Sequence, residues 1–160
     1  MNFGYADDSI VLLSNELFTE MILPQIKRIY DEFSLEGGKR SIHLGGDAQR
    51  FFPILEKELN IKEFDTGYPI DFKKLYEQLS PDVQVLGGPN IMLLKSGTKQ
   101  QVKDEVKRIL HSGVMLKSKK FILREANALA PGTPLENVNA IFEACEEYGY
   151  YDFYSSDGDD

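Results

Sequence analysis

The sequence predicts an α/β fold with a parallel sheet of about five βα units. Short apolar segments alternate along the chain with stretches whose apolar residues recur at helical spacing. This alternation is typical of parallel strands joined by right-handed helical crossovers. Glycine, a carboxylate or an amide follows each apolar segment, as loops leading from a strand into a helix require. We expect a single domain over residues 1–153, because no change of composition marks a second one.

Composition supports one domain with a substantial core, since 42% of the 160 residues are hydrophobic and 28% are charged. The net charge of -8 argues against a general nucleic-acid binder, which needs a basic surface. No apolar run approaches the roughly 20 residues of a membrane span, so we expect no membrane partner and a cytoplasmic protein. The single cysteine, Cys145, excludes an intramolecular disulfide framework. Residues 154–160 are small and acidic and are expected to be disordered.

Five segments have the length and apolar character of parallel strands. They lie at residues 2–6, 40–44, 61–64, 83–86 and 121–123. Each is apolar on both faces, which is typical of parallel strands buried on both sides.

The first helical region is expected after Ser14, a favourable N-cap residue, with Leu17 and Met21 facing inward. Pro24 interrupts it. A second helical stretch follows at residues 25–33, and its apolar side contains Ile26, Ile29, Tyr30 and Phe33.

Two further helices follow the second and third predicted strands. Asp47 is the expected N-cap of the first of these, and its core residues are Phe51, Leu55 and Leu59. The other spans residues 71–79 and presents Phe72, Leu75, Tyr76 and Leu79 to the core.

The next helix begins with a capping box, because Gln101 stands three residues after Thr98. Its apolar residues Val102, Val106, Ile109 and Leu110 follow the spacing of an amphipathic helix.

The last helix also has a marked start signal. Thr133 is the expected N-cap, Pro134 takes the first helical position, and Glu136 stands three residues after the cap. The predicted core stripe of this helix is Val138, Ile141, Phe142, Cys145 and Tyr148.

Polar residues follow every predicted strand, and the carboxyl ends of parallel strands are where such folds bind ligands. The substrate-binding candidates at these positions are Asp8, Asp47, Asn90, Arg124 and Glu125. A purely structural role is the alternative for each position. The loops between strands and helices need turn residues and N-caps, and Arg124 and Glu125 can form ion pairs across the loops.

Several motifs together resemble the uroporphyrinogen decarboxylase superfamily, which also contains the corrinoid-dependent methyltransferases. These are ADDS at 6–9, IHLGGD at 42–47, FDTGYP at 64–69, GGPN at 87–90 and PGTPLEN at 131–137. The match covers nearly the whole chain and is most specific in its last third. It is closest to the decarboxylase-like proteins of corrinoid methyl transfer rather than to the enzyme of porphyrin biosynthesis.

The resemblance implies a TIM (β/α)8 barrel with its active site at the carboxyl ends of the strands. A complete barrel needs about 250 residues, so this chain corresponds to a partial TIM barrel, the C-terminal half or slightly more. An incomplete barrel leaves open sheet edges. We therefore expect either a fragment of a split or truncated gene that pairs with an N-terminal barrel half, or a homodimer.

In the methyltransferase branch, the resemblance implies a zinc site formed by His-x-Cys and a second cysteine. His43 matches the first ligand, but Gly45 and Asn127 stand where the cysteines would be. Glycine has no donor side chain and an amide is a poor zinc ligand beside a thiolate. Cys145 is expected to face the core of the last helix. No zinc and no other metal are therefore expected.

The same resemblance makes His43, Asp65 and Asn127 the catalytic candidates, with a corrinoid or a tetrapyrrole as the possible ligand. The implied activity is methyl transfer involving a methylated small molecule or a methyl-corrinoid, and the isolated chain is expected to lack full activity. Two alternatives stay open. One is a non-catalytic barrel remnant, and the other is a uroporphyrinogen decarboxylase, although a tetra-anionic substrate needs more cations than this acidic mouth supplies. His43 itself also has a purely structural interpretation, as does His111 at the end of its helix.

Overall fold

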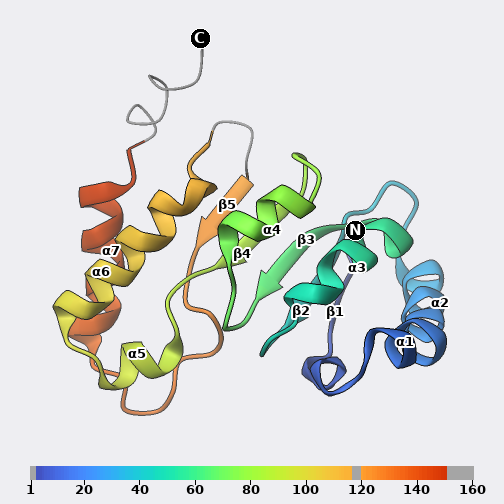
Figure 1. The fold of residues 1–160 in the computed structure, drawn as a ribbon, viewed down its shortest axis with the longest axis horizontal. Helices are drawn as coiled ribbons and strands as arrows, with labels where there is room; N and C mark the ends of the chain where they lie inside the picture. Colours follow the sequence, from blue (N-terminus) through green and yellow to red (C-terminus); the bar gives the residue numbers. More distant parts are fainter. Residues whose placement is uncertain (1–2, 117–119, 151–160) are drawn as a thin grey trace, which may run out of the picture.

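A single five-stranded parallel sheet organises the chain, as Figure 1 shows for the computed structural model. The structure describes residues 3–116 and 120–150, so the predicted tail at 154–160 lies outside the described residues. The strands are β1 (Phe3–Ala6), β2 (Arg40–Leu44), β3 (Ile61–Thr66), β4 (Gln84–Gly87) and β5 (Lys120–Leu123). They lie side by side in chain order, which confirms the predicted partial barrel of about five βα units.

Helical segments connect the strands and lie on one side of the sheet. The first connection holds η1 (Asp8–Leu12), α1 (Asn15–Leu17), η2 (Phe18–Ile22) and α2 (Leu23–Phe33). Later connections hold η3 (Gln49–Phe51), α3 (Phe52–Leu59), α4 (Phe72–Gln78), α5 (Ile91–Ser96), α6 (Lys99–Ile109) and η4 (Leu110–Val114), and α7 (Leu135–Tyr148) follows β5. The short helix α5 was not predicted from the sequence. No helix of the described ranges is long and apolar enough to cross a membrane.

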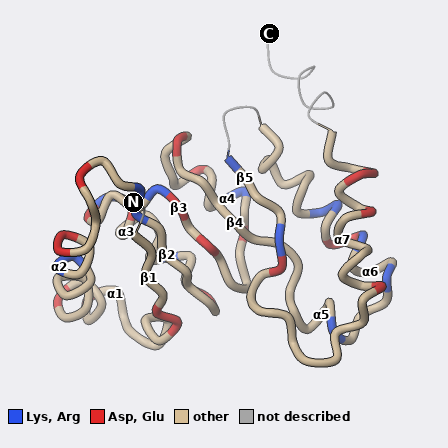
Figure 2. Tube along the Cα trace, turned by 180° about the vertical axis from the view of Figure 1, so that it is seen from behind, with Lys and Arg blue, Asp and Glu red and all other residues tan. Residues whose placement is uncertain are grey.

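The two faces of the sheet differ in chemistry. Ile42, Phe64 and Val85 are paired in register, and all three are buried under the helices. The opposite face carries polar residues such as His43 and Asp65, and Figure 2, seen from behind, shows the strands in front with no described helix across them. At the sheet edges, β1 and β5 alternate between half-buried and exposed residues. The prediction that every strand is buried on both faces is therefore wrong.

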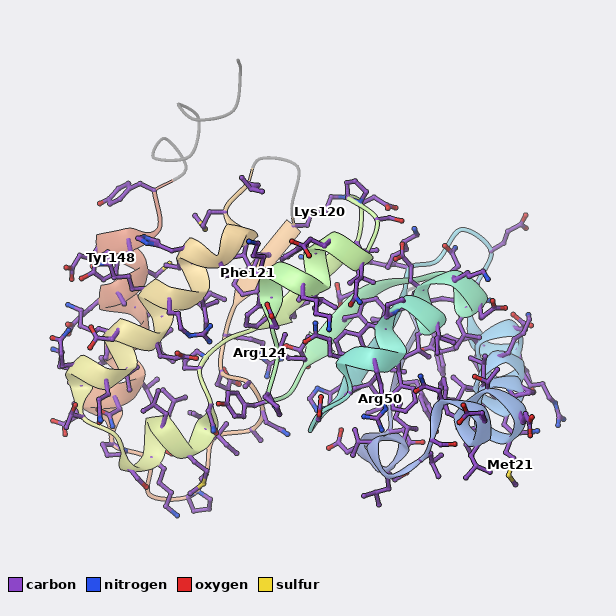
Figure 3. The ribbon with its side chains drawn as sticks, in the orientation of Figure 1. Met21, Arg50, Lys120, Phe121, Arg124 and Tyr148 are labelled. Carbon is purple, nitrogen blue, oxygen red and sulfur yellow. The ribbon has the colours of Figure 1, made fainter. Side chains whose placement is uncertain are left out.

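The first helical region confirms its predicted cap but not its predicted inner face. The Ser14 hydroxyl accepts the Leu17 N–H at 3.2 Å. Leu17 and Met21, however, are 47% and 61% exposed, and Met21 points away from the rest of the chain in Figure 3. Phe18 is buried in their place, because the wide π-helical turn η2 rotates the inward face relative to a regular α-helix. The prediction that Pro24 interrupts the helical region is wrong, because η2 runs directly into α2 and Pro24 lies in the first turn of α2.

Two further expectations in the first half of the chain are corrected. Phe33 is exposed at the end of α2, although its ring stacks on Phe3. Asp47 does not cap a helix, because η3 begins at Gln49 after Ala48. The Asp47 carbonyl instead accepts a bond from the Arg50 guanidinium at 2.9 Å. The predicted core residues of this region are confirmed, since Phe51, Leu55 and Leu59 are all buried.

The central helices agree closely with the sequence. Asp71 caps α4 by accepting the Lys74 N–H, and Thr98 and Gln101 form the predicted capping box of α6. The predicted inward residues of both helices are buried, namely Phe72, Leu75, Tyr76, Leu79, Val102, Val106, Ile109 and Leu110.

Helix α7 differs most from expectation. The Thr133 hydroxyl donates to the Ala130 carbonyl, and Pro134 precedes the helix without a side-chain cap. The buried stripe consists of Asn137, Ala140, Ile141 and Ala144. Small side chains on this stripe allow α7 to pack closely against α6. Phe142 is 66% exposed and Cys145 is exposed, so the prediction that they face the core is wrong.

Candidate functional site

A cavity of about 410 Å³ opens on the polar face of the sheet. Its walls are formed by Gly4, Tyr5, Ala6, Ser41, Ile42, His43, Glu63, Asp65, Leu86 and Arg124. The strand register explains this gathering, because Ala6, His43, Asp65 and Leu86 pair in one row across four strands. Arg124 follows β5 directly and reaches the same row from the far end.

The centre of the site is a chain of charged contacts across three strands. The Nδ1 atom of His43 lies 2.9 Å from Oδ2 of Asp65. The same carboxylate oxygen accepts a bond from Nη1 of Arg124 at 3.1 Å, and Nη2 of Arg124 donates to Glu125 at 2.9 Å. All four side chains are between 24% and 33% exposed, so these contacts are largely shielded from water. In a neutral imidazole, this arrangement places the proton on Nδ1 and leaves Nε2 as an acceptor.

Asp8 approaches the other side of the imidazole. Its Oδ1 lies 3.8 Å from Nε2 of His43 and accepts the backbone N–H of Gly45. Asp8 belongs to η1, whose N-cap is Asp7, so the short helix holds the Asp8 carboxylate over the end of β2. Burial and the adjacent Asp7 carboxylate raise the pKa of Tyr5 at the same end of β1. We refer to Asp8, His43, Asp65, Arg124 and Glu125 as the rim cluster.

Glycines let the loops around the rim cluster pack backbone against backbone. A Cβ added at Gly67 would lie 2.5 Å from the Cα of Gly45, and one added at Gly88 would lie 1.7 Å from the carbonyl oxygen of Arg124. Neither position has room for a side chain. These contacts hold the turn after β2 against the turn after β3, and the turn after β4 against the residue that follows β5.

Five predicted site residues do not line this cavity. Asp8 and Glu125 contact residues at its rim, whereas the other three lie elsewhere. The Asn90 side chain caps α5 by accepting the Met92 N–H. Asn127 accepts the Ala128 N–H within its own loop. Asp47 lines a separate surface hollow with Gln49, Arg50, Asp71, Lys74 and Gln78.

Sequence reasoning missed a second polar row beneath the rim cluster. Ser41 and Glu63 stand two residues before His43 and Asp65, so they share the same face of the sheet. The Lys39 ammonium lies 2.6 Å from both the Glu63 carboxylate and the Gln84 amide oxygen. The period-two spacing within each strand was the signal that would have identified these residues.

The residues present do not fit the thiolate zinc site that the resemblance implies. Gly45 offers no donor atom, and a Cβ there would lie 2.9 Å from Cγ of Asp8, so a cysteine at this position would require that carboxylate to move. Cys145 lies on the exposed face of α7 rather than in the core, which corrects the expectation for that residue. Within residues 3–116 and 120–150, no group of three or more His, Cys, Asp or Glu residues is placed to hold a metal ion.

Comparison with known proteins identifies the family. A model of the family "Uroporphyrinogen decarboxylase (URO-D)" matches residues 3–148. The chain belongs to the URO-D family.

Relatives of this URO-D chain include a methyltransferase known from sequence and one known from structure. This chain is 28% identical over 138 residues to a methylated-thiol–coenzyme M methyltransferase of Methanosarcina mazei. The match covers 85% of this chain and 34% of the relative. A solved methyltransferase from Methanosarcina mazei has a TM-score of 0.70 and 20% identity, covering 92% of this chain and 42% of the other. The chain thus spans about a third of the curated relative, and the structural likeness supports the barrel-type fold.

The PGTPLEN segment of this URO-D chain contributes to structure rather than to the cavity. Asn137 is 2% exposed, and its amide nitrogen donates to the carbonyl oxygens of Leu94 at 2.9 Å and Gly97 at 2.8 Å. The last residue of the motif therefore fastens α7 to the end of α5.

Proposed function

We propose that this chain is a URO-D-like domain of the methyltransferase type, and that its cavity binds a methylated small molecule or a methyl-corrinoid. The rim cluster is the observation that carries the proposal. It brings a histidine, three carboxylates and an arginine together at the carboxyl ends of β1, β2, β3 and β5. Similarity to a methanogen methyltransferase supports methyl transfer as the reaction class. We also propose that the isolated chain lacks full activity, since it spans only a third of that relative.

Three members of the rim cluster have distinct roles in this proposal. Oδ2 of Asp65 lies 2.9 Å from Nδ1 of His43, and in this proposal it holds the proton of a neutral imidazole on Nδ1 and leaves Nε2 free to act as an acceptor. Nε2 is placed to take the proton of a thiol or hydroxyl group when that group accepts a methyl group. Arg124 holds Asp65 in position, and Leu86 provides an apolar wall for the methyl group.

Titration of the chain with methylcobalamin, followed by its visible absorbance, tests the proposal. We expect saturable binding that weakens at least about tenfold in His43→Ala, which corresponds to about 1.4 kcal/mol. His111→Ala is the matched control, because His111 lies in η4 and does not line the cavity. Binding that is absent, or equal in the wild type and in His43→Ala, contradicts the proposal.

A non-catalytic barrel remnant is the second candidate, favoured by the residues that replace the family cysteines. Gly45 and Asn127 stand at the positions of the family cysteines, which removes the thiolate chemistry of that branch. A remnant predicts a folded chain that binds neither methylcobalamin nor a porphyrin. Uroporphyrinogen decarboxylation is less favoured, because Arg124 is the only cation lining the described cavity and two carboxylates already pair with it.

A further inference from the structure

Each end of the sheet has a strand with one unpaired edge. Within the described residues, β1 pairs only with β2, and β5 pairs only with β4, so each has one free edge. Figure 1 shows these edges at opposite ends of the sheet, with α1 and α2 beside one and α7 beside the other. Free edges of parallel strands present unpaired N–H and C=O groups that readily accept another strand.

Exposed apolar side chains concentrate in the chain segments that contain the two edge strands. Of the thirteen large apolar side chains exposed in the described part, eleven lie before β2 or after η4 in the sequence. Those before β2 are Leu12, Leu17, Met21, Phe33 and Leu35, and those after η4 are Leu116, Ile122, Leu129, Leu135, Phe142 and Tyr150. Between these segments, Tyr68 and Met92 are the only exposed large apolar side chains of the described residues. Such a distribution marks interaction surfaces rather than scattered surface residues.

A groove lies beside the free edge of β5. It is a mainly apolar cavity of about 240 Å³ lined by Leu123, Arg124, Glu125, Leu129, Val138, Ile141, Phe142 and Cys145, and we call it the edge groove. In a right-handed βα crossover, a helix packs over its own strand and the strand that follows. Helix α7 follows β5 and forms the other wall of the edge groove, so this face of α7 is placed to cover a sixth parallel strand.

We propose that the edge groove is occupied by β1 of a second copy of this chain. Strand β1 has the required properties, because it is parallel to β5 in the sheet and carries the half-buried aromatic residues Phe3 and Tyr5 at alternate positions. The exposed Leu17 and Met21 of that copy then pack beside Phe142. A two-fold axis repeats the contact, so one dimer covers both free edges of both copies.

The dimer also completes the proposed ligand cavity, which in one copy lies on an uncovered sheet face. The two polar faces enclose one shared lumen, so each cavity gains its missing wall from the partner. This inference rests on the sheet edges and not on the proposed methyl chemistry. Methylcobalamin binding and dimer formation are therefore measured and refuted separately.

Light scattering coupled to size exclusion tests the proposal at protein concentrations from about 1 μM to about 200 μM. We expect a mass twice that of the 18.2-kDa chain. Phe142→Glu introduces a charge into the edge groove at an exposed position and shifts the protein to a monomer. The matched control Met92→Glu changes a 55% exposed side chain on α5 and leaves the dimer intact. Circular dichroism verifies that both variants are folded.

A complementation experiment identifies which edges meet. Leu17→Glu alters the β1 end of the molecule and is also expected to produce a monomer. Mixing Leu17→Glu with Phe142→Glu restores one of the two contacts, so a heterodimer forms at high concentration and the Cys145 thiol is partly protected from a thiol reagent. A wild-type monomer throughout the concentration range, a Phe142→Glu dimer, or a dimer insensitive to Leu17→Glu overturns the proposal. If the barrel closes only with an N-terminal half from a different chain, the wild-type protein alone stays monomeric, which is the first of these results.

Discussion

Replacing Asp65 by asparagine removes the charge on which the rim cluster converges. One carboxylate oxygen of Asp65 contacts both Nδ1 of His43 at 2.9 Å and Nη1 of Arg124 at 3.1 Å. A hydrogen bond to a charged group contributes about 1.5 to 3 kcal/mol. The low end applies here because the three side chains are a quarter to a third exposed, and Glu125 still pairs with Arg124. Since asparagine keeps one weaker acceptor, we expect a loss of about 1.5 to 2 kcal/mol.

Urea unfolding followed by circular dichroism measures this loss, and a domain of this size loses about 2 to 4 °C of Tm per kcal/mol. The exposed residue Asp47 gives a matched control, because Asp47→Asn makes the same chemical change outside the cavity and is expected to stay within about 0.5 kcal/mol of wild type. Nitrogen-15 NMR of the two histidines supplies a second readout. We expect the His43 signals to change from a single Nδ1–H tautomer to a mixture, whereas those of His111 stay constant. Equal stability of the two variants with an unchanged His43 spectrum would refute the assigned role of Asp65.

Three further outcomes follow from buried groups. Burial raises the pKa of Tyr30, so the unfolded chain loses this proton first, above about pH 10, and stability then falls by up to about 1.4 kcal/mol per pH unit. Urea unfolding at about pH 9 and about pH 11 should show this component in the wild type and not in Tyr30→Phe. Asn137→Leu leaves two backbone carbonyls unpaired and should cost about 2 to 4 kcal/mol in the same assay, whereas Asn139→Leu on the exposed face of α7 changes little. Gly88→Ala forces a methyl group against the Arg124 carbonyl and should lower stability by about 2 to 3 kcal/mol, measured by thermal denaturation; an unchanged Tm contradicts the close packing of these loops.

The sheet was predictable because its signal is local and strong. Apolar segments such as the one at 83–86 are short, and turn residues follow each of them, so strand order and direction follow from the alternation with helices. Caps with an unambiguous side-chain pattern were also correct, as Ser14 and the Thr98–Gln101 box show. Asp47 and Thr133 failed as caps because a good capping residue near a helix start does not fix which residue the chain uses. The Thr133 hydroxyl has a competing carbonyl three residues earlier.

The candidate site was predictable only where neighbouring strands bring residues into one row. His43 and Asp65 meet because β2 and β3 are adjacent and in register, and this follows from strand order. Arg124 reaches Asp65 across β4 through the length of its side chain, which strand order alone does not specify. Asn127 was a catalytic candidate from the family resemblance, but its side-chain oxygen accepts the Ala128 N–H within its own loop. Asn90 was unrecognised as a cap because α5 itself was not predicted.

The errors in predicted burial lie at the two ends of the molecule. Leu17 and Met21 at one end, and Phe142 and Cys145 at the other, were assigned to the core from helical periodicity, yet all four are exposed. A local cause exists at each end, in the π-helical turn η2 and in the small-residue stripe of α7. Those causes explain which residues replaced them in the core, but not why large apolar side chains remain beside both free edges, where exposure favours aggregation. Burial in an assembled barrel explains both sets with one contact. Assembly also predicts a result that the local causes do not predict. Leu17→Glu and Phe142→Glu should impair association while leaving the unfolding free energy of the monomer within about 0.5 kcal/mol of wild type.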